Sequence, residues 1–145
     1  MGRDITGVSM KIENFVWFRV DSTELSPGEI LKIIGVPPTR SWAIGDFRPK
    51  TKLCGKTNGC IIESGLPTCA SIEEHLSCLF DKVRPYFSNF KHLSAFATIE
   101  LGCAIYAMSM PTVNLGSHVI RFLADINSSV DYDIYIVDES FFETP

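Results

Sequence analysis

Apolar residues recur with two different periods in separate segments of this chain, and this restricts the folds that the chain can adopt. In residues 72–83 they fall three and four positions apart, which predicts an amphipathic helix. In residues 95–101 they alternate with other side chains, which predicts a half-buried strand. Each kind of segment has one apolar face to bury, so we expect helices packed on a sheet.

Two capping boxes mark helix starts. Ser26 and Glu29 form the first, ahead of an apolar run that ends at Gly35. Ser71 and Glu74 form the second, at the start of a helix over residues 71–84. In each box the two side chains satisfy backbone amides that the first helical turn leaves free.

The remaining elements follow from the same periodicities. A third helix is predicted over residues 115–126, with Asn114 or Ser117 as its N-cap. β-branched and aromatic runs with alternation predict strands at residues 15–20, 60–63, 95–101 and 130–137.

We therefore predict an α+β domain with two layers. A mostly antiparallel or mixed sheet of about four to six strands packs against three helices. A length of 145 residues suits one hydrophobic core. We expect a loose N-terminal leader over residues 1–11 and a single domain over residues 12–140, with a long irregular loop at 37–58.

Composition limits the compartment and the cofactors. No apolar run approaches the ~20 residues that span a bilayer, and the N-terminus has no secretory pattern, so we expect a cytoplasmic protein without a membrane partner. The five cysteines have neither the pairing expected of a disulfide framework nor zinc-ligand spacing. We predict no metal and no cofactor.

Catalytic motifs are not found. Gly55-Lys56-Thr57 looks like the end of a phosphate-binding loop, but Lys50 stands where that motif needs glycine. His75 is interpreted as structural, with a ligand contact as the alternative. We assign no catalytic residue and favour a non-enzymatic role.

Two regions are candidates for recognition. Trp42 and Asp46 lie in the long loop, where binding residues are common. After Arg121 the chain has no Lys or Arg, and this end could complement a basic partner. Its acidic residues are Asp125, Asp131, Asp133, Asp138, Glu139 and Glu143. A net charge of −4 disfavours nucleic acid as the partner.

A set of short motifs also occurs in a specific order and spacing. They are Ser26-Pro27-Gly28-Glu29-Ile30, Ile34-Gly35-Val36-Pro37-Pro38-Thr39, Gly45-Asp46, Ile72-Glu73-Glu74-His75-Leu76 and Val130-Asp131-Tyr132-Asp133-Ile134-Tyr135. Over residues 12–137 the chain thereby resembles the bacterial DUF4279 family. The resemblance implies no reaction, but some members are similar to neighbours of toxin–immunity or phage-defence loci, which implies a binding role.

Three functional hypotheses remain open. The leading one is a small protein-binding domain, such as an immunity- or inhibitor-like factor, with Asp131, Asp133 and Asp138 supplying charge and Trp42 an anchor. The second is a small-molecule-binding protein or enzyme with a pocket between the 37–58 loop and the 71–84 helix. That pocket would use His75 and Asp46, together with Arg40. The third is a homodimer formed through a sheet edge.

Overall fold

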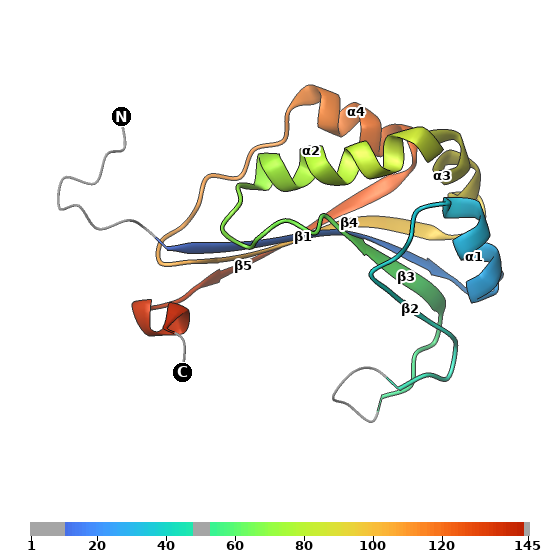
Figure 1. The fold of residues 1–145 in the computed structure, drawn as a ribbon, viewed down its shortest axis with the longest axis horizontal. Coiled ribbons are helices and arrows are strands. Elements are labelled where there is room, and N and C mark those ends of the chain that lie inside the picture. Colours follow the sequence, from blue (N-terminus) through green and yellow to red (C-terminus); the bar gives the residue numbers. More distant parts are fainter. Residues whose placement is uncertain (1–10, 48–52, 144–145) are drawn as a thin grey trace.

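A computed structural model describes residues 11–47 and 53–143 of the chain (Figure 1). Its strands are β1 (Ile12–Ser22), β2 (Arg40–Trp42), β3 (Asn58–Glu63), β4 (Thr98–Ala107) and β5 (Ser128–Ile136). Its α-helices are α1 (Pro27–Ile34), α2 (Ile72–Val83), α3 (Phe87–Leu93) and α4 (Ser117–Asp125). Two 3-10 turns are η1 (Arg84–Tyr86) and η2 (Glu139–Phe142). Apart from Lys11, the leader expected over residues 1–11 lies outside the described residues.

The strands form one five-stranded mixed sheet in the order β2-β3-β1-β4-β5. The central strand β1 is antiparallel to both β3 and β4. Strands β4 and β5 are parallel, and the connection between them contains α4. The α+β prediction with a mixed sheet is therefore confirmed.

The helices cover only one face of this sheet (Figure 1). Alternate residues of β1, from Val16 to Val20, lie between the sheet and the helices and are almost completely buried. Phe18 lies at the centre of this layer, where its ring is 6.0 Å from that of Phe80 and 6.4 Å from that of Phe90. The hydrophobic core is thus the layer between the helices and one side of the sheet.

Both predicted capping boxes form. The side chain of Ser26 accepts a hydrogen bond from the Glu29 amide, and Ser71 accepts one from the Glu74 amide. Gly35 ends α1 in the left-handed conformation, with φ of 67°. The prediction for α4 was wrong in one detail, because its N-cap is Gly116, which has no side chain to provide a cap.

Besides the two 3-10 turns, one strand and one α-helix were not predicted. The 37–58 loop contains β2, whose three residues are too few to show a periodic pattern. The short helix α3 follows α2 after the single turn η1, which contains Pro85. Strand β4 begins at Thr98, three residues later than predicted, and continues without interruption to Ala107. Among the helices of the described residues, none has the length and apolar character needed to cross a membrane.

Candidate functional site

In the part of the chain that the structure describes, no α-helix lies over the second face of the sheet (Figure 1). We call this surface the open face. Its strand positions, which follow from the pairing registers, are Arg40, Trp42, Gly59, Ile61, Glu63, Glu13, Phe15, Trp17, Arg19, Asp21, Thr98, Glu100, Gly102, Ala104, Tyr106, Ser129, Asp131, Asp133 and Tyr135. A sheet face that carries aromatic and charged side chains without a covering layer is a candidate recognition surface.

Trp42 lies at the β2 side of the open face between two arginines. The guanidinium carbons of Arg19 and Arg40 are 5.1 Å and 5.2 Å from the ring centroid, so both make cation–π contacts. A Cβ atom at Gly59, the register partner of Trp42, would lie 2.6 Å from the ring and 2.2 Å from the Val20 carbonyl oxygen. The ring can therefore rest on the sheet only because residue 59 is glycine.

The same arrangement recurs in the middle of the sheet. Trp17 pairs with Gly102, and a Cβ atom there would lie 2.3 Å from the indole ring. Both tryptophans are thus held against the backbone of the neighbouring strand. Such fixed aromatic surfaces lose little conformational entropy when a partner covers them.

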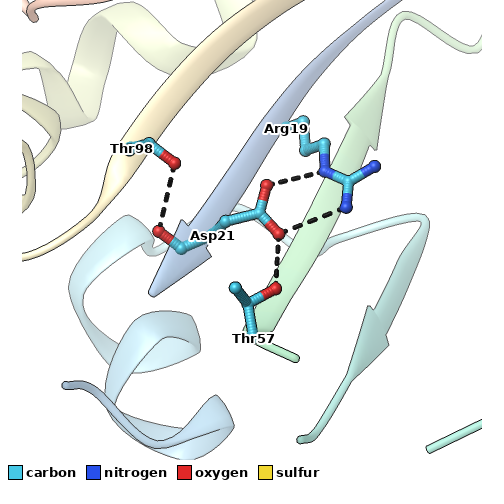
Figure 2. A network of polar contacts seen from close by, with 4 residues as sticks. All are labelled: Arg19, Asp21, Thr57 and Thr98. Atoms are coloured by element: carbon cyan, nitrogen blue, oxygen red, sulfur yellow. Dashed lines mark hydrogen bonds and ion pairs between the residues drawn. The ribbon is translucent and has the colours of Figure 1, made fainter. Parts of the chain in front are cut away.

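A polar network fixes Arg19 beside Trp42 (Figure 2). The Arg19 Nε donates to Asp21 at 2.6 Å, and the Thr57 hydroxyl donates to the same carboxylate at 2.7 Å. The Thr98 hydroxyl donates to the Asp21 backbone carbonyl at 3.4 Å. The hydrogen bond to Asp21 raises the pKa of Arg19, so its positive charge is held in place.

Negative charge gathers on β4 and β5. Glu100 lies beside Ser129 and next to the row formed by Asp131 and Asp133. Partial burial, followed by repulsion from Asp131, raises the pKa of Glu100, although Arg19 acts in the opposite direction. The carboxylates therefore crowd one another, and a cation brought by a partner would relieve this repulsion.

Aromatic rings close the other end of the open face. The Tyr106 ring stacks on Tyr135 at 4.8 Å and on Phe141 of η2 at 4.9 Å. Figure 1 shows η2 on the side of the sheet away from the helices. Asp138 caps this turn by accepting a hydrogen bond from the Ser140 amide at 3.0 Å, so its observed contact is a structural one.

The predicted site residues fall into separate places. Trp42, Asp131 and Asp133 lie on the open face, although they come from distant parts of the sequence. Asp46 stabilises a turn by accepting from the Ala43 amide at 2.9 Å. His75 belongs to α2 on the helix side and is 2% exposed.

The residues expected to line one pocket between the 37–58 loop and the 71–84 helix line two different cavities. The loop residues Arg40, Trp42 and Asp46 line a small cavity of about 140 Å³ together with Arg19 and Lys56. His75 lines a different cavity. The sheet itself separates the two places, because Trp42 is on the open face and α2 is on the covered one.

Metal ligation and thiol reactivity are two further kinds of chemistry that His, Cys, Asp and Glu side chains can supply. Across residues 11–47 and 53–143, no three His, Cys, Asp or Glu side chains are grouped so that they could hold a metal ion. All five cysteines are free. Burial raises the pKa of Cys60 to about 12 and that of Cys103 to about 11, so neither core thiol is a reactive thiolate near neutral pH.

Arg19, Glu100 and Trp17 are surface residues that the sequence analysis did not single out. Each stands on a strand next to core residues, and its position on the open face depends on the register with neighbouring strands. In the sequence, these positions could be recognised only as the non-core positions that alternate with apolar residues along the strands.

The fold and this surface define a domain with one helix-covered sheet face and one uncovered face bearing aromatic and charged side chains. The sequence profile of the family described as "Domain of unknown function (DUF4279)" matches residues 10–137. The chain therefore belongs to the DUF4279 family. No curated protein and no solved structure matches it.

Proposed function

We propose that this protein is a non-enzymatic binding domain that docks on a partner protein through the open face. The observation that supports this most directly is that three candidate residues from distant segments, Trp42, Asp131 and Asp133, lie on the same uncovered surface, on its two opposite edge strands. That surface also has two separate charged regions. Arginines lie near β2, and carboxylates lie on β4 and β5. Complementary charge steers a partner and fixes its orientation.

The charge pattern defines the partner's chemistry. A matching surface carries Lys or Arg opposite Asp131 and Asp133, and a carboxylate opposite Arg40, which has no salt bridge among the described residues. Arg19 is already paired with Asp21 and serves to hold Trp42 in place. The exposed rings of Phe15 and Tyr135 supply apolar contact area.

A homodimer through the edge of β5 is the less favoured arrangement. Two antiparallel copies of this strand would bring the Asp131 and Asp133 side chains of both chains close together, and like charges across a strand pair are destabilising. Charged residues on edge strands commonly prevent such pairing. The solution mass distinguishes the two cases.

The proposal extends to the biological role. A compact domain with a charged docking face suits an immunity- or inhibitor-like factor that neutralises another protein in the bacterial cytoplasm. Some family members resemble proteins found next to toxin–immunity or phage-defence loci, and this resemblance supports the role. The size and charge of the surface support it as well.

The test compares two charge reversals of equal size. The wild type, the variant Asp131→Lys/Asp133→Lys and the control Glu24→Lys/Asp125→Lys are immobilised and exposed to a lysate of the native host. Glu24 and Asp125 are exposed acids outside the open face, so the control changes the net charge by the same amount. A photo-reactive residue at position 135 identifies proteins in direct contact with the open face.

We expect the wild type and the control to capture the same protein, with cross-links from position 135, and the open-face variant to lose it. Rising salt should weaken this capture, because the charges lie at the surface. Equal capture by the open-face variant would remove the acidic row from the proposal. Capture of the protein by the wild type without any cross-link from position 135 would reject the open face altogether.

A further inference from the structure

Strand β5 forms one edge of the sheet and is long and regular. It has nine residues, contains neither glycine nor proline, and pairs with β4 along its whole length. Among the described residues, no strand pairs with its outer side. Such an edge presents a row of backbone N–H and C=O groups with which another extended chain can pair.

The bonds to β4 show which backbone groups point outwards. The Val137 amide, directly after the strand, donates to the Ala107 carbonyl at 2.9 Å, and Ala107 is the register partner of Ile136. In a parallel pair, every second residue directs its backbone groups at the partner strand. The odd-numbered residues of β5 are therefore bonded to β4. The residues whose N–H and C=O groups point away from the sheet are Val130, Tyr132, Ile134 and Ile136.

This outer edge is accessible. Within residues 11–47 and 53–143, the outward backbone groups of β5 take part in no hydrogen bond. Val130 and Ile136, near the two ends of the row, are 38% and 53% exposed. An incoming strand can therefore reach the row along its length.

The side chains beside the edge select a basic strand. Asp131 and Asp133 are exposed on the open face, and neither has a salt bridge to another described residue. Because their backbone groups are bonded to β4, an antiparallel strand added to β5 meets them in non-hydrogen-bonded pairs, where side chains approach most closely. Opposite charges in such pairs are stabilising. Lys or Arg at alternate positions of the incoming strand therefore fits this edge.

The same two acids disfavour a second copy of the chain on this edge, because like charges would then face each other. The other side of β5 favours apolar residues at the intervening positions, since Val130 and Ile136 expose apolar side chains there. The edge thus discriminates between partners by repelling one kind of strand and attracting another.

We propose that the partner protein docks by adding an extended segment to the outer edge of β5, antiparallel to it, in which Lys or Arg alternates with apolar residues. The basic side chains lie over Asp131 and Asp133, and the backbone of the segment bonds to the outward groups of β5. This inference rests on the proposed docking function and specifies the part of the partner that makes the contact.

The probe is an acetylated and amidated eight-residue peptide in which lysine and valine alternate. Amide hydrogen exchange of the wild-type protein is followed by NMR during titration with the peptide. We expect the amides of Val130, Tyr132 and Ile134 to exchange at least about tenfold more slowly in the complex, because hydrogen-bonded amides are protected. The amides of Asp131 and Asp133, already bonded to β4, should change much less.

A charge swap places the peptide beside the acids. A peptide in which glutamate replaces each lysine should leave the exchange of the wild type unchanged. The variant Asp131→Lys/Asp133→Lys should show the reverse preference and bind the glutamate peptide. Binding of the lysine peptide with equal affinity by this variant and by the wild type would contradict the pairing.

Two N-methylated peptides test the backbone contact. In the antiparallel arrangement the valines direct their N–H groups at β5 and the lysines direct theirs away. N-methylation of the valines should therefore abolish binding, whereas N-methylation of the lysines should preserve it.

Three results would overturn the proposal. They are no binding of the unmodified peptide, binding that survives N-methylation of the valines, and slower exchange of the same amides in the protein alone at rising concentration, which would indicate a second copy on the edge. A partner that is nevertheless captured through Asp131 and Asp133 would then bind the open face without adding a strand, so the docking function is judged separately.

Discussion

On the open face, the position of one side chain depends on the residue opposite it on the neighbouring strand. The absence of a side chain at Gly59 and Gly102 allows Trp42 and Trp17 to lie against the sheet. Arg19 is held by Asp21 and in turn contacts Trp42. The shape of the surface therefore depends on glycines that leave room for the two indole rings.

The substitution Gly59→Ala tests this dependence. Its Cβ atom would lie 2.2 Å from the Val20 carbonyl oxygen, and this backbone atom cannot move without distorting β1. We expect a loss of about 1–3 kcal/mol in the free energy of unfolding, as for other overpacked sites. Gly28→Ala is the control, because a Cβ there meets nothing within 4 Å and should be neutral or slightly stabilising. Urea unfolding measures both, and equal stability of the two variants would contradict the close approach.

A second residue-scale prediction concerns pH. Burial lowers the pKa of His75 below its ordinary value of 6.5, so the unfolded chain binds a proton more readily than the folded one. The stability conferred by the neutral imidazole is thus fully present above about pH 6.5 and is lost as the pH falls towards the folded pKa. In His75→Gln this part of the pH dependence should disappear. His118→Gln, at an exposed position on α4, should retain it. The free energy of unfolding by urea across this range is the measurement, and identical slopes in both variants would refute the assignment.

The residues that the sequence analysis singled out are unusual in their local context. Trp42 stands alone in an irregular loop, and Asp131 and Asp133 belong to an end of the chain that has acids but no Lys or Arg. Arg19 and Glu100 were missed because their significance comes from the register between β1 and β4, which local sequence does not encode.

At the scale of elements, α1 and α2 each begin at a capping box. The capping box of α2 joins Ser71 and Glu74 reciprocally, with hydrogen bonds of 3.1 Å and 3.2 Å. This end of α2 also leads into the buried row that includes His75, Leu76 and Leu79. Fixing the first turn therefore fixes the helix that covers the middle of the sheet.

Ser71→Ala should lower the free energy of unfolding by about 1 kcal/mol, because the Glu74 amide loses its acceptor. Ser77→Ala is the matched control within the same helix, at an exposed position where alanine has the higher helix propensity. We expect it to be neutral or slightly stabilising. Thermal unfolding of both variants provides the comparison, and a control that loses as much stability as Ser71→Ala would exclude the cap as the cause.

Elements with at least two turns or several alternating residues were predictable, and shorter ones were not. The segments that became β1, α2 and β5 each repeat their pattern several times. In contrast, β2 has three residues and exists only because β3 supplies its hydrogen bonds. Helix α3 follows a turn that contains Pro85, which sequence reasoning treats as a stop.

For the molecule as a whole, the layer architecture separates the hydrophobic core from the charged and aromatic side chains of the open face. One sheet face and four helices contain the core, whereas the open face carries the polar and aromatic side chains. The layers could be inferred from amphipathic segments alone. The strand order could not, because the central place of β1 and the parallel pairing of β5 arise from long-range contacts.

This separation predicts that the open face carries a stability cost. The raised pKa of Glu100 means that the folded chain holds its proton more tightly than the unfolded chain, whose value is near 4.5. Stability present below that value is lost as the pH rises through the folded pKa. Glu100→Gln should therefore be more stable than the wild type near neutral pH, and the difference should vanish in acid. Glu24→Gln, in an exposed position away from the sheet, should show no such change. Urea unfolding at several pH values measures the effect. If Glu100→Gln is less stable at neutral pH, then attraction to Arg19 outweighs the crowding, and the acidic row has no strain for a basic partner to relieve.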